Sequence, residues 1–212
     1  MAKRYNKDFF KELKEKSDVL YNSVAALNWG ETIGDKYIIS DRYNFIWKTE
    51  QGEGKHLIKI DCDIKDYILN FINTEKKKQK VVGIEKEISI FFGTDSQNYL
   101  SYTRFVSVIV LYINGNGAHV IVSRFDLPKM YDYRYRLLRE TDITGEVIRN
   151  LKPFLKKNKI NFEVHSDYNS SLQYKSAGVV QEATNYMKYL GFNLKIKTES
   201  WAASYSADHF CK

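Results

Sequence analysis

Two acidic residues follow hydrophobic segments that lie far apart in the chain. The segment Ile88 to Phe92 leads into Asp95, and the segment 161–166 leads into Asp167. If these segments are neighbouring parallel strands, both carboxylates lie at one edge of a sheet, because adjacent strands are only about 4.8 Å apart. Carboxylates that close raise each other's pKa unless a cation compensates their charge, and hard divalent cations prefer oxygen ligands. The pair therefore predicts a metal site, with a simple turn residue as the alternative for Asp95.

Two further acids are candidates for the same site. A helix is expected at about 131–157, and on a helical wheel Glu140 lies about 60° from the centre of its apolar stripe, whereas Glu146 lies about 180° away. Glu140 is thus the inward acid; the alternative is an edge residue in an ordinary ion pair. Near the C-terminus we favour Asp208 over His209, because adjacent helical residues do not share a face. The stripe consists of Leu137, Thr141, Thr144, Ile148, Leu151 and Leu155.

The elements that must position these acids follow a simple order. Three strands are expected at about 86–94, 103–113 and 118–127, with a hairpin turn at Asn114–Gly117 between the second and the third. The helix at 131–157 then acts as a crossover, so that a fourth strand at 161–167 pairs parallel with the first. A helix at 176–190, a strand at 193–198 and a helix-like tail complete the chain. This order predicts an α/β fold with a mixed five-stranded sheet, three strands antiparallel and two parallel, and helices on its faces.

The first part of the chain has a different pattern. An apolar helical stripe ends at Gly30, and β-like runs follow at 36–40, 43–48 and 56–61. We expect residues 1–60 to form an α+β extension and residues 61–212 the main domain. The stripe either packs on its own domain or docks a protein partner. A short helix through Tyr67 to Ile72 leads into the basic run 76–80, which we expect to be a solvated loop, with phosphate contact as the alternative.

Composition restricts the class of protein. The formal net charge is +7 and the pI is about 9.1, which suits a polyanionic partner such as nucleic acid. Cys62 and Cys211 have no metal-type spacing, so a zinc site is not expected. The chain has no apolar run long enough for a membrane span and no secretory signal pattern. A cytoplasmic protein without a membrane partner is expected, in a bacterial cell or encoded by a phage.

The ordered motifs resemble the ribonuclease H-like superfamily, and more narrowly the bacterial YkuK family of ribonuclease H-like proteins. The resemblance covers about residues 60–212 and leaves the first sixty residues outside it. The matching pieces are Gly93–Gln97, Thr103–Val106, Glu140–Thr141, Glu163–Asp167 and Ala203–Asp208.

The resemblance implies a ribonuclease H-like fold and a site that holds two Mg²⁺ or Mn²⁺ ions. By this likeness Asp95 bridges both ions, Glu140 and Asp167 complete the first ion's site, and Asp208 belongs to the second. The implied reaction is in-line hydrolysis of a phosphodiester bond. The resemblance does not name a substrate; our leading hypothesis takes RNA, an RNA–DNA hybrid or structured DNA as the substrate.

Other residues are candidates for substrate contacts. Ser96 and Gln97 directly follow Asp95. His165 shares a strand face with Asp167, and that face either is exposed to solvent or lines a cleft. Arg104 and Lys175 are expected to contact phosphates, which would orient the substrate without reading its sequence. Tyr99 and Tyr102, in the loop after Asp95, either pack locally or stack on bases.

Two functions remain open at this point. The first is a metal-dependent nuclease, and the second is an inactive nuclease-fold protein that serves as a nucleic-acid-binding or assembly component. Retention of all four acids favours the enzyme. A phosphotransferase is disfavoured, because the Gly115–Gly117 turn joins two antiparallel strands and does not lead into a helix.

Overall fold

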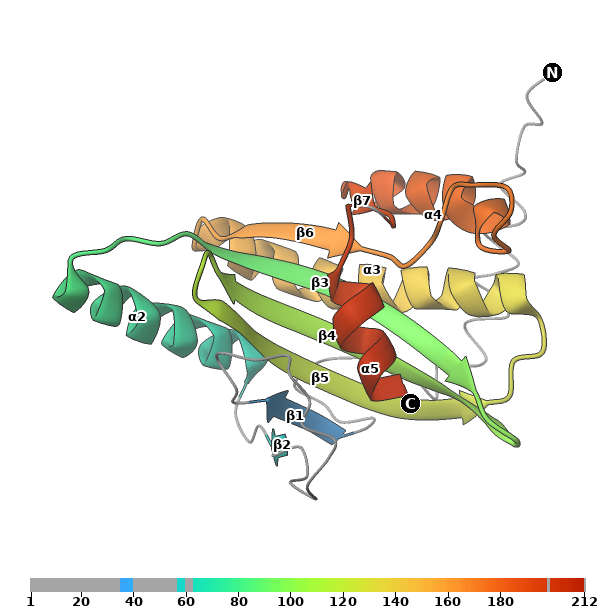
Figure 1. The fold of residues 1–212 in the computed structure, drawn as a ribbon, viewed down its shortest axis with the longest axis horizontal. Helices are drawn as coiled ribbons and strands as arrows, with labels where there is room; N and C mark the ends of the chain where they lie inside the picture. The colour runs from blue at the N-terminus through green and yellow to red at the C-terminus, as the bar shows by residue number, and fades with distance from the viewer. Residues whose placement is uncertain (1–34, 40–56, 60–62, 198, 212) are drawn as a thin grey trace.

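The computed structural model describes residues 35–39, 57–59, 63–197 and 199–211 of the chain. Its strands form one sheet in the order β2-β1-β5-β4-β3-β6-β7 (Figure 1). The strands are β1 (Asp35–Ile39), β2 (Leu57–Lys59), β3 (Ile88–Asn98), β4 (Tyr102–Ile113), β5 (Gly117–Pro128), β6 (Asn161–His165) and β7 (Leu194–Lys195). The helices are α2 (Ile64–Val82), α3 (Tyr133–Lys157), α4 (Ala177–Tyr189), the π-helical η1 (Ala202–Ala207) and α5 (Asp208–Cys211).

The centre of the sheet is the predicted antiparallel meander. β3 pairs with β4 and β4 with β5 along their whole lengths. The β4–β5 turn contains Gly115 at φ 67° and Gly117 at φ 90°. Both lie in the left-handed region that favours glycine, so the turn predicted at Asn114–Gly117 is confirmed.

The crossover helices place two parallel strands beside the meander. α3 leads to β6, which pairs parallel with β3, and α4 leads to β7, which pairs parallel with β6. The predicted α/β fold with a mixed sheet of three antiparallel and two parallel strands is therefore confirmed. β1 continues this sheet on the edge of β5, and β2 pairs with β1. The predicted helix before Gly30 and the predicted strand at 43–48 lie outside the described residues.

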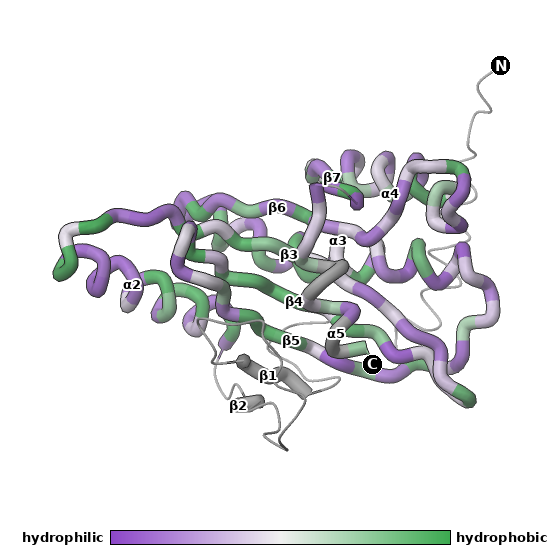
Figure 2. The backbone as a smooth tube through the Cα atoms, viewed as in Figure 1, coloured by the Kyte–Doolittle hydropathy of each residue, from purple (hydrophilic) through white to green (hydrophobic). Residues whose placement is uncertain are grey.

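Successive side chains along each strand point to opposite faces of the sheet, so the core has one part on each face. On β3, Ile90 and Phe92 pack in the cluster that includes apolar residues of α2 and α3, whereas Phe91 packs in the cluster that includes Ala202 and Cys211 near the C-terminus. Figure 2 shows hydrophobic residues recurring along β3, β4 and β5. β4 is buried on both faces, which explains its nearly continuous apolar run.

Several predicted boundaries differ from the structure. The strand predicted at 193–198 is only Leu194–Lys195, and the strand predicted at 161–167 ends at His165. The basic run 76–80 is not a loop, because α2 continues to Val82 and ends at Gly83 in the left-handed conformation, φ 74°. Lysine is a good helix former, so the run extends the helix.

β3 does not end before Asp95, because β4 continues to pair with it as far as Asn98. None of the described helices combines the length and the apolar composition needed to cross a membrane.

Candidate active site

Asp95 lies where β3 loses its neighbour on one side. The last pair between β3 and β6 is Gly93 with His165, whereas β4 still pairs with β3 at Asp95, opposite Val106. Beyond Gly93, no strand among the described residues pairs with this edge of β3. Asp167 follows the end of β6 by two residues, so the parallel pairing brings the two acids toward one place, as the sequence predicts.

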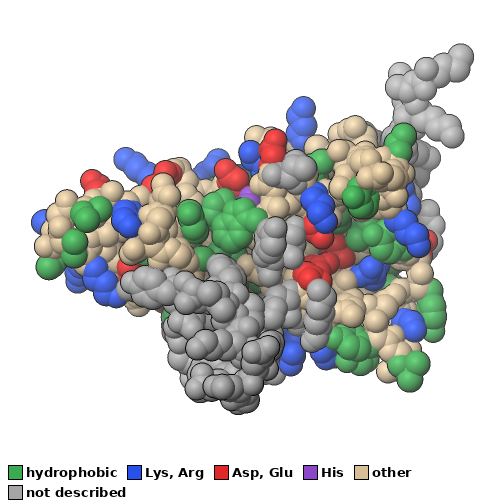
Figure 3. All heavy atoms as spheres, in the orientation of Figure 1, with side chains coloured by type: hydrophobic (Ala, Val, Ile, Leu, Met, Phe, Trp, Pro, Cys, Tyr) green, Lys and Arg blue, Asp and Glu red, His purple; other side chains and the backbone are tan. Residues whose placement is uncertain are grey.

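The charges of two other acids act on Asp95 at this edge. The pKa of the half-buried Asp95 is raised from 3.8 to about 7, first by burial and further by the charges of Asp208 and Asp167. The backbone N–H of Ser96 and the charge of Arg136 act in the opposite direction. α5 thus brings Asp208 into electrostatic range of Asp95. Figure 3 shows acidic side chains gathered beside the C-terminal helix, with basic and hydrophobic side chains around them.

Glu140 lies on α3, which packs on the face of the sheet opposite the C-terminal residues Ala202 and Cys211. Its residue is 3% exposed, which fits the inward position that the helical spacing predicts. Its carboxylate accepts a hydrogen bond of 2.5 Å from Ser96 Oγ. Burial raises the pKa of Glu140 well above its ordinary value, and the charge of Asp95 raises it further. The four predicted acids are therefore coupled through Asp95.

Arg136 is a cation of this site that the sequence reasoning did not select. Its Nη1 donates to the backbone oxygen of Ser96 and, over 2.7 Å, to Ser96 Oγ. The same nitrogen lies 3.8 Å from Glu140 Oε1. The signal was present in the sequence, because Arg136 stands four residues before Glu140 on one helix face.

Buried hydroxyl groups next to Asp95 and Glu140 in the chain form hydrogen bonds with one another. Thr144 Oγ1 donates to Thr94 Oγ1 over 2.8 Å, and the Thr94 and Ser107 hydroxyls are also 2.8 Å apart. Tyr168 shares a hydrogen bond of 2.9 Å with Thr141 and donates to the Leu137 carbonyl. These bonds join α3 to β3, β4 and the segment after β6, and they restrict movement of Glu140 relative to Asp95.

His165 is 1% exposed and holds the start of the C-terminal helical segment. Its Nδ1 accepts from the backbone N–H groups of Trp201, at 3.3 Å, and Ala202, at 3.2 Å. Its Nε2 lies 3.2 Å from Glu163 Oε2. These contacts position the segment that carries Asp208, and substrate contact by His165 stays a prediction.

The remaining predicted contact residues lie at different depths. Ser96 is buried against Glu140, and Gln97 is half-buried on the same strand. The Arg104 guanidinium donates to both carboxylate oxygens of Asp126, at 2.9 and 3.1 Å. Lys175 is exposed in the segment between β6 and α4. The basic run 76–80 lies near the C-terminal end of α2, which in Figure 1 points away from α5.

The four carboxyl groups are chemically suited to a divalent cation, because such cations prefer oxygen ligands. The raised pKa values of Asp95 and Glu140 are what a bound cation would compensate. However, in the part of the chain that the structure describes, no three acidic, histidine or cysteine side chains are grouped closely enough to hold a metal ion as they stand. Arg136 lies beside Glu140, and Lys197 Nζ lies 3.5 Å from Asp167 Oδ1. The protein's own cations therefore provide part of the compensation.

Comparison with known proteins agrees with this fold. The chain is 26% identical over 164 residues to YkuK of Bacillus subtilis, described as an uncharacterized protein; the match covers 71% of this chain and 90% of YkuK. No solved structure matches the chain. The family model described as "Ribonuclease H-like" matches residues 63–212, so the chain belongs to the ribonuclease H-like family.

Proposed function

We propose that the protein is a metal-dependent nuclease that hydrolyses phosphodiester bonds in RNA, an RNA–DNA hybrid or structured DNA. The observation that carries this proposal is the raised pKa of Asp95, about 7, at an open strand edge within electrostatic range of Asp167 and Asp208. Such strongly perturbed carboxyl groups are concentrated at functional sites. A site of this kind suits a substrate whose reacting group is itself an anion, provided that cations are present.

In this proposal Asp95, Glu140, Asp167 and Asp208 hold Mg²⁺ or Mn²⁺. Bound divalent cations would supply charge neutralisation at the phosphate and a more acidic water molecule. Asp95 is central, because the pKa values of both Asp95 and Glu140 respond to the other acids. Ser96 and Arg136 hold Glu140 in orientation and limit its rotation.

Metal titration together with cleavage assays tests the proposal. Wild type, Asp95→Asn and Glu140→Gln are compared by calorimetry with Mg²⁺ and Mn²⁺, and by cleavage of labelled RNA, hybrid, duplex and single strands. Glu146→Gln is the matched control, because Glu146 lies on the same helix but pairs with Arg149 at the surface. We expect at least about a hundredfold loss of cleavage in the two site variants and little change in the control.

Two outcomes contradict the nuclease proposal. One is absence of metal binding and of cleavage in the wild type at millimolar metal. The other is cleavage that persists unchanged in Asp95→Asn, which would point to a contaminating nuclease or to a different site.

The second candidate function is a nucleic-acid-binding or assembly protein without catalysis. The contacts of Glu140 with Arg136 and of Asp167 with Lys197 favour it, because these cations occupy the place that metals would otherwise share. It predicts nucleic-acid binding that is equal in EDTA and in Mg²⁺ and is unchanged by Asp95→Asn. The same set of variants therefore distinguishes the two functions.

A further inference from the structure

An aromatic ring lies at the rim of the acid cluster. Tyr133 is the first residue of α3, and it is 40% exposed. The Arg136 guanidinium lies 5.3 Å from the centre of its ring. One side of the ring is thus backed by a cation, while a large part of the side chain remains open to solvent.

Helix geometry directs this ring toward the acids. Tyr133, Arg136 and Glu140 stand at positions i, i+3 and i+7, which fall on one face of a helix. Two turns separate Tyr133 from Glu140, about 10 Å along the axis. The electrostatics agree, because the pKa of Tyr133 is raised first by burial and then by Glu140, Asp95 and Asp167, while Arg136 opposes the shift. The ring therefore lies within reach of a nucleotide next to one held at the acids.

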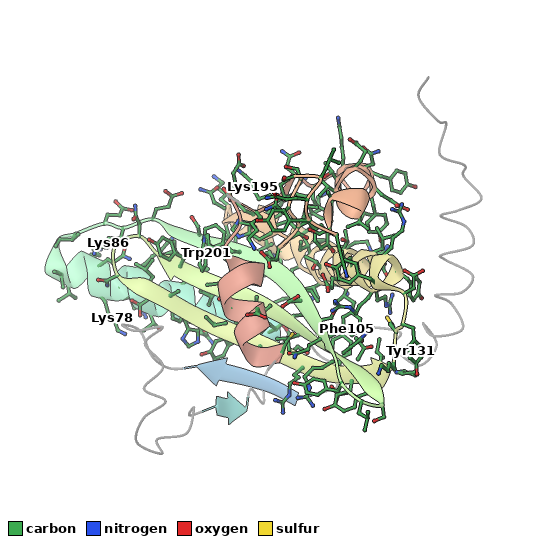
Figure 4. All side chains as sticks on the ribbon, turned by 45° about the vertical axis from the view of Figure 1, so that its right-hand side comes forward. Lys78, Lys86, Phe105, Tyr131, Lys195 and Trp201 are labelled. Carbon is green, nitrogen blue, oxygen red and sulfur yellow. The ribbon has the colours of Figure 1, made fainter. Side chains whose placement is uncertain are left out.

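Further exposed apolar and basic side chains lie just before Tyr133 in the chain and at the β3–β4 hairpin tip. Tyr131 is 84% exposed, and Lys129 Nζ lies 5.3 Å from its ring centre. Lys129 also donates to the carbonyl of Leu100, which is 93% exposed at the tip of the β3–β4 hairpin. In Figure 4, Tyr131 lies at the end of the molecule where the hairpin tip and the segment before α3 come together. Isolated exposed apolar residues are ordinary, but here Tyr131 and Leu100 share the cation Lys129, and Tyr131 stands two residues before Tyr133.

An exposed aromatic ring with a cation behind it suits the flat face of a nucleobase. Stacking of a base on an aromatic side chain is independent of sequence, but it requires an unpaired base, because bases within a duplex stack on one another. We propose that Tyr133, backed by Arg136, stacks on an unpaired base adjacent to the scissile phosphate, so that the substrate is single-stranded at the point of cleavage. This inference rests on the proposed nuclease function and assigns it a substrate class.

Binding of single-stranded and blunt duplex oligonucleotides to the full chain in EDTA tests the inference without cleavage. The variants are Tyr133→Ala, Tyr133→Phe, which keeps the ring, and Tyr189→Ala, a control that removes a tyrosine 86% exposed on α4. We expect Tyr133→Ala to weaken single-strand binding by about 10-fold or more. The Phe variant and the control should stay within about twofold of wild type, and duplex binding should not respond to Tyr133→Ala.

A 2-aminopurine base in the single strand supplies a second readout that needs no variant. Its fluorescence should be quenched on binding to wild type and to Tyr133→Phe, and not on binding to Tyr133→Ala. RNA and DNA strands are measured in parallel to learn which sugar the site accepts. Cleavage of the same strands is then measured with Mg²⁺ and Mn²⁺.

Several outcomes overturn the inference: equal losses for single strand and duplex, tighter wild-type binding of duplex, absence of quenching, or an unchanged Tyr133→Ala variant. If stacking depends on Tyr133 but no strand is cut, the stacking site stands and the nuclease proposal fails. If duplex is cut and single strands are not, the nuclease stands and this inference fails.

Discussion

Asp95 shows how a single side chain acquires unusual chemistry from its surroundings. In the sequence it is a lone acid after a hydrophobic run, and a turn residue would look the same. In the structure it lies inside β3, half-buried, near two other acids, and its pKa is about 7. Burial is the largest cause, so the shift exists before any substrate or cation binds.

The raised pKa of Asp95 predicts that the metal-free protein loses stability as pH rises. The folded state keeps a proton up to about pH 7, whereas the unfolded chain releases it near 3.8, so the free energy of unfolding should fall between these values. Glu140, whose pKa is also raised, acts in the same direction. Urea unfolding in EDTA at pH 5 and pH 7.5 measures the difference.

Asp95→Asn should reduce this pH dependence, because the amide does not titrate. Glu146→Gln serves as the comparison, since that surface acid lies outside the cluster. Equal pH dependence in Asp95→Asn and in wild type would show that Asp95 is ionised without cost in the folded protein.

Replacing Arg136 is expected to lower the stability of the protein and to raise its affinity for metal ions. Replacing it with Gln removes the hydrogen bonds to Ser96 and leaves the buried Glu140 without its nearby cation, so the metal-free protein should lose about 1–3 kcal/mol. Mg²⁺ should bind more tightly to this variant, because a competing cation has been removed. Calorimetry and urea unfolding measure the two effects. Arg149→Gln is the matched control on the same helix, and tighter Mg²⁺ binding there as well would refute the local explanation.

At the scale of elements, the position of the C-terminal helical segment depends on the imidazole of His165. His165 accepts two backbone N–H groups at Nδ1, which requires that nitrogen to be unprotonated. Burial lowers the pKa of His165, which is consistent with a neutral ring. The alignment of Asp208 with Asp95 therefore depends on a residue at the end of β6.

Removal of this imidazole should loosen the segment selectively. His165→Ala leaves one buried and one partly buried N–H group without an acceptor and creates a cavity, a loss of about 2–4 kcal/mol. Amide hydrogen exchange should accelerate across η1 and α5 while the centre of the sheet stays protected, and metal affinity should fall. Glu163→Gln keeps the ring and should have a much smaller effect. Uniformly faster exchange in every element of His165→Ala would contradict this specific role.

At the scale of the whole molecule, the charge distribution is uneven. The chain carries a net charge of +7, yet Asp95 feels the charges of Asp167 and Asp208, and Glu140 feels the charge of Asp95. A polyanion is attracted by the molecule as a whole and repelled by the site itself. Cations at the acids would remove this local repulsion.

Nucleic-acid binding should therefore weaken with salt and strengthen with Mg²⁺. Between 50 and 200 mM KCl we expect the affinity to fall by about tenfold or more, since a few released counterions suffice for that. Mg²⁺ at constant ionic strength should raise the affinity of wild type and have less effect on Asp95→Asn. Fluorescence anisotropy measures both. Affinity that does not depend on salt would exclude a mainly electrostatic attraction.

Most of the architecture was predictable from local pattern. The strands of the meander, the two crossover helices and the inward position of Glu140 follow from periods of two and 3.6 residues, and the turn follows from its Asn-Gly residues. Boundaries were less predictable. The end of β3 depends on how far β4 pairs with it, and the end of α2 depends on Gly83 and not on the charge of the lysines.

The sequence by itself determined the order of the strands and helices, and it placed four acids at positions from which they can meet. Only the tertiary structure decided that Arg136 reaches Ser96 on β3, that Lys197 lies against Asp167, and that His165 is buried beneath the C-terminal segment. The reason is physical. Periodicity records which face of its own element a side chain occupies, whereas contacts between elements depend on where neighbouring strands stop and how helices pack across the sheet.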